Sequence, residues 1–169
     1  MKYGRSHRRL LAVAVSSLLV CGTAVATTDT ANLTVSATVT GTCALTSAPT
    51  LGFGTVNQLG NTDAQANITY WCTNGTSASI TLGGGGSGDI NARRMGTALA
   101  PLGYQLYTTA ARTAVWGDGV GNGNAVTVTG TGYSAAGTPV AVYGRVPAAS
   151  SATASAGGYS DTVVITITF

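Results

Sequence analysis

Few residues in this sequence belong to the types that carry out enzymatic chemistry. Among its 169 residues the one His is His7 and the one Lys is Lys2, and there is no Glu. Without His beyond position 7 the chain can form neither a Ser-His-Asp nor a Cys-His arrangement, and it has no imidazole ligand for a metal. Beyond position 2 it also lacks the Lys of a phosphate-binding loop or a Schiff base. These absences favour a protein that is not an enzyme.

Two glycine-rich segments invite comparison with ligand-binding loops, but neither has the required spacing. Residues 83–89 lack the Lys of a phosphate loop, and Asp89 falls one residue short of the spacing in a calcium-binding glycine repeat. Residues 117–124 contain Asp118 and two Asn, without the acidic last ligand of a helical calcium loop. Both segments are therefore predicted to be turns or loops. No metal, nucleotide or organic cofactor is expected.

The aromatic residues leave two interpretations open. They could form a sugar-stacking face, which would make the protein a carbohydrate-binding module. Alternatively, they pack in a core and against cross-strand partners, the commoner arrangement for aromatic side chains in alternating strands, and we favour this second interpretation. The residues concerned are Trp71, Trp116, Tyr104, Tyr107 and Tyr143.

The N-terminus has the pattern of a secretory signal peptide. Four basic residues precede a mainly apolar run over residues 10–20, and a small-residue site, Ala24-Val25-Ala26, follows. This combination predicts a signal peptide over residues 1–26 and therefore export from the cytoplasm. Lipidation at Cys21 is the weaker alternative, because Val20 stands where a small residue is expected. The basic residues are Lys2, Arg5, Arg8 and Arg9.

Removing residues 1–26 changes the charge of the chain. The full sequence carries a formal net charge of +3 at pH 7, whereas residues 27–169 hold four Arg and five Asp, a charge of −1. No basic patch remains to neutralise phosphates, so a nucleic-acid partner is not expected. The neighbouring pair Arg93 and Arg94 could form ion pairs with Asp residues across a loop, but we favour a solvated turn.

Cys43 and Cys72 are the two cysteines that remain after residue 26. An even pair in an exported chain predicts one disulfide, and two buried free thiols are the weaker alternative in an oxidising compartment. A bridge that closes a loop of this length would stabilise the fold by roughly 3–4 kcal/mol in the chain-entropy model.

Apolar and polar residues alternate with a period of two in several short segments, which are separated by Gly-, Asn- and Ser-rich breakers. Such alternation indicates half-buried strands, with one face in the core and one in solvent. No convincing helical stripe of ten or more residues interrupts the pattern. The sequence therefore predicts a single all-β sandwich domain. The expected strands cover residues 33–40, 66–72, 78–82, 102–106, 125–128, 140–143 and 163–169.

Several motifs follow one another in an order that resembles a known family. Together with a cysteine after an N-terminal alternating strand, they resemble the spore coat protein U domain, the family of subunits of archaic chaperone–usher (Csu-type) pili. The resemblance covers nearly all of residues 27–169. The motifs are Leu51-Gly52-Phe53-Gly54, Trp71-Cys72-Thr73-Asn74-Gly75-Thr76, Arg94-Met95, Leu102-Gly103-Tyr104-Gln105-Leu106-Tyr107, Trp116-Gly117-Asp118-Gly119, Val142-Tyr143-Gly144-Arg145-Val146-Pro147-Ala148 and Gly158-Tyr159-Ser160-Asp161-Thr162-Val163.

The resemblance implies a subunit with an incomplete immunoglobulin-like β-sandwich. Such a subunit is exported to the periplasm, held by a chaperone and polymerised on the cell surface by an outer-membrane usher into a pilus that supports adhesion and biofilm formation. Each groove is filled by the N-terminal strand of the neighbouring subunit, which is called donor-strand complementation. The implied organisation is a donor-strand segment over residues 27–41 and a pilin domain over residues 42–169. A secreted spore-coat or surface protein of the same fold is the alternative.

Two strands receive roles from this resemblance. The donor strand presents Leu33, Val35, Ala37 and Val39 on one face and polar residues on the other. The competing interpretation is that this strand folds back into its own sandwich. The C-terminal strand presents Val163, Ile165, Ile167 and Phe169 inward, beside the groove and the chaperone. In the family, basic chaperone residues anchor the C-terminal carboxylate of the subunit, which here would belong to Phe169.

Overall fold

A computed structural model describes residues 23–97 and 100–169 of the chain. The chain divides into two units, residues 1–37 and residues 38–169. Most of the predicted signal peptide, with Cys21, lies outside the described residues. In the described part of the chain, no helix has the length and apolar character needed to cross a membrane.

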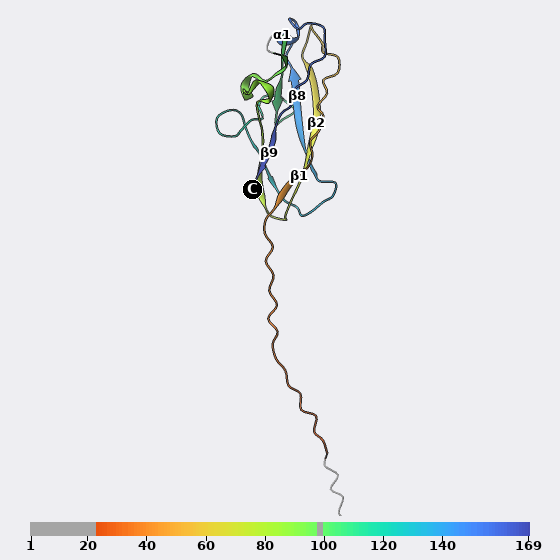
Figure 1. Ribbon diagram of the computed structural model, residues 1–169, viewed down its shortest axis with the longest axis vertical. Coiled ribbons are helices and arrows are strands. Elements are labelled where there is room, and N and C mark those ends of the chain that lie inside the picture. Colours follow the sequence, from red (N-terminus) through yellow and green to blue (C-terminus); the bar gives the residue numbers. More distant parts are fainter. Residues whose placement is uncertain (1–22, 98–99) are drawn as a thin grey trace, which may run out of the picture. The chain divides into compact units, whose positions relative to one another are not determined.

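Residues 23–42 belong to no helix or strand, and each of them is exposed (Figure 1). The alternation over residues 33–40 predicted a strand, but in the part of the chain that the structure describes none of these residues belongs to one. Its largest apolar side chains are Leu33, Val35 and Val39, which are 87 %, 83 % and 82 % exposed.

The unit over residues 38–169 is built from antiparallel strands (Figure 1). A four-stranded sheet has the order β1 (Cys43–Ser47), β2 (Thr62–Cys72), β8 (Thr138–Val146) and β6 (Gln105–Tyr107). A three-stranded sheet has the order β7 (Val126–Thr129), β3 (Ser77–Leu82) and β9 (Ile165–Thr168). A separate ribbon pairs β4 (Arg94–Thr97) with β5 (Ala100–Gly103). The short helices are η1 (Gly85–Ser87), η2 (Ile90–Ala92) and α1 (Ala148–Ser151).

The core lies between the two larger sheets, where alternate strand residues point inward. In β3, Ala78, Ile80 and Leu82 are buried, while the residues between them are not. The second half of β2 repeats this pattern with Ile68, Tyr70 and Cys72. Burial of a large aliphatic side chain contributes roughly 1.5–3 kcal/mol, so the two inward rows hold the sheets together. The prediction of an all-β sandwich is confirmed.

Two features of the strand pattern differ from the expectation. The segment over residues 102–106 is divided at Tyr104, whose N–H donates to the Arg93 carbonyl oxygen (3.0 Å), so that β5 and β6 belong to different sheets. Strands β1 and β4 were not predicted, because each is too short to display several periods of alternation. Long-range pairing rather than local pattern stabilises them.

Cys43 and Cys72 are joined by a disulfide, with an S–S distance of 1.99 Å. They stand directly opposite each other in the antiparallel pairing of β1 with β2, so the bridge ties the start of β1 to the end of β2. This is the pairing that the cysteine count predicted for the exported chain.

We expect the exported protein to contain no alkylatable thiol under non-reducing, denaturing conditions, as measured by mass spectrometry. Cys43→Ser should lower the free energy of unfolding by about 3–4 kcal/mol, because it removes a constraint on the unfolded chain. The exported amount should fall with it. Two free thiols in the wild-type exported protein would contradict the assignment.

Candidate functional site: an apolar groove beside an edge strand

Two strands at the edges of the sandwich each pair on one side only. β1 pairs with β2 and β9 pairs with β3, and β1 and β9 approach each other across the sandwich. Among the residues that the structure describes, no strand is added to the free side of either one. An edge of this kind presents unpaired N–H and C=O groups and can accept a further strand.

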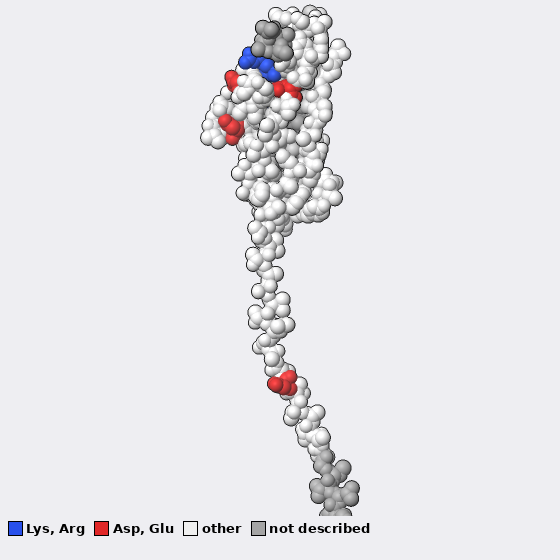
Figure 2. Space-filling model, in the orientation of Figure 1, with Lys and Arg blue, Asp and Glu red and all other residues white. Residues whose placement is uncertain are grey.

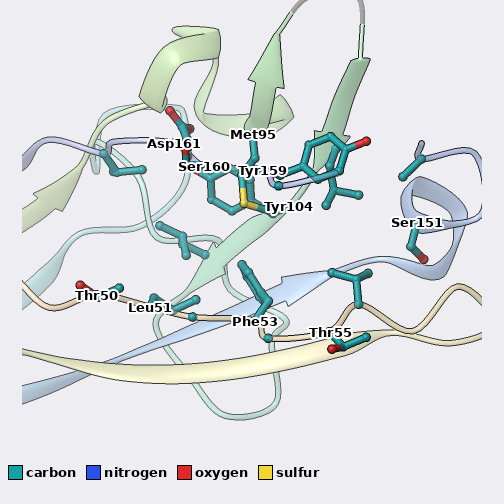
Figure 3. A pocket seen from close by; sticks show the side chains of 18 of the residues that line it. Thr50, Leu51, Phe53, Thr55, Met95, Tyr104, Ser151, Tyr159, Ser160 and Asp161 are labelled. Carbon is teal, nitrogen blue, oxygen red and sulfur yellow. Dashed lines mark hydrogen bonds between the residues drawn. The ribbon is translucent and has the colours of Figure 1, made fainter. Parts of the chain in front are cut away.

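A cavity of about 830 Å³ opens beside β9. We call it the apolar groove. One wall is the segment over residues 49–56, and the facing wall is the segment over residues 154–161 (Figure 3). Its floor consists of side chains from the sandwich core, and β9 and the residues before it contribute to one side. The floor residues are Ile68, Leu82, Met95, Leu102, Leu106 and Val142, and the residues on the β9 side are Val163 and Ile165.

In the wall over residues 49–56, half-buried and exposed residues alternate although the segment belongs to no strand. Leu51 and Phe53 are half-buried, whereas Gly52 and Gly54 are exposed, and none of the four belongs to a strand. Phe53 packs edge-on against Tyr104, with ring centroids 6.3 Å apart. Side-chain packing thus stabilises this wall.

Gly144 of β8 allows this wall to lie close to the sheet. A Cβ atom there would come within 2.8 Å of both Leu51 Cδ2 and Phe53 Cζ. Any side chain at position 144 would therefore push these two residues toward the space of the groove.

The facing wall is held by Asp161. Tyr104 Oη donates to Asp161 Oδ2 (2.6 Å), and the N–H of Gly86 donates to Asp161 Oδ1 (2.7 Å). Burial raises the pKa of the Tyr104 hydroxyl, and its bond to Asp161 raises it further, so this hydroxyl remains a donor. Gly85 has φ of +65°, and a Cβ there would overlap the Asp161 carboxylate. The glycine-rich segment over residues 83–89 is thus a loop, as predicted, and it receives a carboxylate of the same chain.

Arg93 lies beneath the groove floor and is 1 % exposed. Its Nε donates to the carbonyl oxygen of Gly83 (2.9 Å), and its Nη2 donates to those of Leu82 (3.1 Å) and Trp116 (2.8 Å). Its Nη1 donates to Gln105 Oε1. Burial lowers the pKa of Arg93, while coulombic interactions with Tyr104 and Asp161 act in the opposite direction.

The expectation of a solvated turn is therefore wrong for Arg93, although its neighbour Arg94 is exposed. Arg93 finds four acceptors because β3, β6 and the segment before Gly117 converge on it. None of these segments is close to it in the sequence, so no local pattern indicated its burial.

The C-terminal strand meets the expectation in part. Val163 and Ile165 line the groove, and Ile167 is half-buried two residues further on. Phe169, which the alternation placed inward, is 59 % exposed. The reason is that the pairing of β9 with β3 ends at Thr168, opposite Ser79, and Phe169 lies beyond it.

The aromatic residues do not form a common face. Trp116 is fully buried, with its indole N–H donating to the Ile80 carbonyl oxygen (2.9 Å), and Tyr104 is 7 % exposed. Tyr143 lies under the Arg112 guanidinium, 5.8 Å from it. Trp71, Tyr107 and Tyr143 are only half-buried, and Trp71 packs against Tyr133. A sugar-stacking face made by the predicted set is therefore not present.

Asp118 forms the turn that was predicted over residues 117–124. Its carboxylate accepts the N–H groups of Val120 (2.9 Å) and Asn122 (3.0 Å) and the Asn122 side-chain amide (2.8 Å). These bonds lower the pKa of the Asp118 carboxyl, with the Asn122 side chain as the largest contribution. Within residues 23–97 and 100–169, no three His, Cys, Asp or Glu side chains come together as a metal site.

Comparison with known proteins assigns this chain to a protein family. The model of the Spore Coat Protein U domain family matches residues 29–166. "Protein U" of Myxococcus xanthus is 37 % identical over 174 residues, which cover 92 % of this chain and 93 % of that protein. The chain therefore belongs to the Spore Coat Protein U domain family.

A solved structure shows the same fold. It is the crystal structure of a pre-assembly complex between a chaperone and the tip adhesion subunit of archaic chaperone–usher Csu pili from Acinetobacter baumannii. One of its chains matches with a TM-score of 0.50 and 22 % identity over 78 % of the present chain. The match spans 40 % of that solved chain. The immunoglobulin-like fold class expected from the resemblance is confirmed.

Most walls of the groove were not identified as site residues from the sequence. Four of the lining residues belong to the family motifs but received no role from the sequence: Leu51, Phe53, Tyr159 and Asp161. Tyr104 was considered only as part of a sugar-stacking face or a core. A local signal did exist for the first wall, because Pro49, Leu51 and Phe53 alternate with Thr50 and two glycines. The alternation is short and interrupted by glycine, so it did not predict a strand.

Proposed function

We propose that this protein is a structural subunit of a surface pilus, assembled by the chaperone–usher route through donor-strand complementation, and that the pilus supports adhesion and biofilm formation. One observation carries the proposal. The same chain combines an apolar groove beside the unpaired edge of β9 with an exposed segment, residues 31–39, that has the alternation of a strand. No catalytic activity belongs to this role.

The proposed organisation has three parts. Residues 1–26 are the signal peptide for export to the periplasm. Residues 27–41 form the donor-strand segment, and residues 42–169 form the domain that receives the donor strand of the next subunit. In the fibre, Leu33, Val35, Ala37 and Val39 of one subunit enter the groove of its neighbour and pair with the free edge of β9.

The chemistry of the groove and of the donor strand supports this pairing. A strand advances about 3.3 Å per residue, so alternate side chains enter the groove at intervals of about 7 Å. Each larger aliphatic that becomes buried contributes roughly 1.5–3 kcal/mol, and each main-chain bond to β9 contributes about 0.5–1.5 kcal/mol. The exposure of Leu33 and Val35 in the single chain is the reason for this gain.

A periplasmic chaperone and an outer-membrane usher are the other proposed partners. Before assembly, the groove leaves apolar side chains and the β9 edge accessible, which is a hazard for aggregation. A chaperone strand laid along Val163, Ile165 and Ile167 would cover this edge until the donor strand replaces it. The matched crystal structure, which contains a chaperone together with a pilus subunit, supports such a partner for this fold.

Expression of the full chain together with a chaperone and usher of the archaic type tests the proposal. We expect thin filaments by electron microscopy and a ladder of subunit multimers in unheated detergent gels that collapses on heating. Secretion of a folded monomer or a non-fibrous coat would instead favour the spore-coat or surface-protein alternative. This alternative follows from the chain's membership of the Spore Coat Protein U domain family.

A further inference from the structure

The turn between β2 and β3 anchors the residues that precede β1. The Thr42 N–H donates to Thr73 Oγ1 (3.1 Å), and the Thr73 N–H donates to the Thr42 carbonyl oxygen (2.8 Å). The Thr73 hydroxyl also lies 3.4 Å from the carbonyl oxygens of Thr40 and Thr42, to which it can donate. The chain is therefore attached to the folded unit as far back as Thr40.

This anchoring leaves almost no free linker before the proposed donor strand. The last inward residue of that strand is Val39, which is the residue directly before Thr40. One residue spans at most about 3.6 Å. If the donor strand ends at Val39, the subunit that receives it therefore lies directly against the end of the donor subunit that carries the Thr73 anchor. Consecutive subunits cannot be separated by a flexible tether if residues 31–39 occupy the groove.

An aromatic pair, half-buried Trp71 and exposed Tyr133, lies beside this anchor. Trp71, two residues before Thr73, packs edge-on against Tyr133, with ring centroids 5.2 Å apart. Tyr133 is 74 % exposed, and its neighbour Gly132 is bridged to Cys72 through a backbone bond (3.1 Å). Trp and Tyr are enriched in the buried centres of protein interfaces.

The surface around this pair carries no charge. The segments over residues 40–47, 69–80 and 126–142 contain no Asp, Glu, Lys or Arg. In the face seen in Figure 2, no charged side chain lies around β1, whereas charged side chains gather toward the end that carries α1. A second protein can therefore cover this end without burying an unpaired charge, which would be strongly unfavourable.

We propose that the Trp71–Tyr133 pair is a docking surface for the next copy of this chain in the fibre. The inference rests on the proposed pilus function. The occupant is a second copy, because the anchored donor strand brings the receiving subunit to this end of the molecule. The docked pair and the Thr73 anchor together restrict the angle between consecutive subunits, so that the fibre is stiffer than its donor strands alone would make it.

Site-specific photo-crosslinking in assembled fibres of the full chain tests the docking surface. Tyr133→p-benzoylphenylalanine places the probe in the pair, and Val120→p-benzoylphenylalanine is the control, because Val120 is 89 % exposed in a distant turn. We expect crosslinks between two copies at position 133. Their yield should exceed the yield at position 120 by about tenfold, which corresponds to a free-energy difference of about 1.4 kcal/mol. Fibres without a copy-to-copy crosslink at 133 would overturn the docking surface and leave the pilus function intact. If wild-type chains form no polymer, the proposed function and this inference both fail.

A matched pair of variants tests the anchor. Thr73→Val keeps the shape of the side chain but removes the hydroxyl, whereas Thr73→Ser keeps the hydroxyl. With the probe at position 133, we expect Thr73→Val to reduce the crosslinked fraction several-fold and to give more strongly curved fibres in electron micrographs. Thr73→Ser should match the wild type in both measurements. Equal crosslinking and curvature in Thr73→Val and Thr73→Ser would refute the role of the anchor.

Discussion

Val35→Asp abolishes fibre formation and leaves the amount of chaperone-bound subunit close to that of the wild type; this is the result we expect for the central residue of the donor strand. In the single chain Val35 is 83 % exposed, so a carboxylate there remains hydrated and the folded unit is unaffected. In the fibre the same carboxylate would enter the apolar groove of the neighbour, among side chains such as Leu82 and Leu102. The effective penalty for burying an unpaired ion is several kcal/mol, on top of the lost contribution of the valine.

Ser36→Asp is the matched control for this experiment. It introduces the same charge one residue away, on the outward face of the strand, where the carboxylate stays in water. We expect Ser36→Asp to assemble into fibres, as seen by electron microscopy and by multimer ladders in unheated gels. Normal fibres from Val35→Asp would show that residues 31–39 are not the donor strand. Loss of the folded subunit itself would indicate that the strand fills its own sandwich.

Arg93→Met is expected to cause the largest loss of stability among single substitutions in the folded unit. The variant removes the donors to the carbonyl oxygens of Leu82 and Gly83, to that of Trp116 and to the Gln105 side chain. Leaving a buried acceptor without a partner costs about 1–3 kcal/mol, so the three backbone carbonyls together cost at least about 3 kcal/mol. This is a large part of the free energy of unfolding of a typical domain, which is roughly 5–15 kcal/mol.

Denaturant unfolding of the purified protein measures the effect, with Arg94→Met as the control. The two variants change the charge of the chain equally, but Arg94 is exposed and none of the four bonds depends on it. We expect the midpoint of unfolding to fall strongly for Arg93→Met and to change little for Arg94→Met. Arg93→Lys should lie between them, because an ammonium cannot reproduce the planar fork of five N–H donors. Equal midpoints for the two Met variants would disprove the role of Arg93.

The sequence by itself determined the fold class, the main strands and the pairing of the cysteines. Alternation along residues 66–72 and 78–82 depends only on which face of each strand is buried, and this is a local property of the chain. Export and cysteine parity likewise need no knowledge of spatial neighbours, and they predicted the bridge between Cys43 and Cys72. The spacing of the glycine-rich segments was enough to predict loops.

Tertiary structure alone decided the burial of Arg93, the exposure of Phe169 and the walls of the apolar groove. Arg93 is buried because β3, β6 and the chain around Trp116 supply its acceptors from positions 10 to 23 residues away. Phe169 is exposed because its ladder ends one residue earlier, opposite Ser79. The groove exists because the segments over residues 49–56 and 154–161, which are about a hundred residues apart in the sequence, face each other across side chains of the core. Each of these outcomes depends on contacts between segments that are distant in the sequence, and a period of two residues contains no information about such contacts.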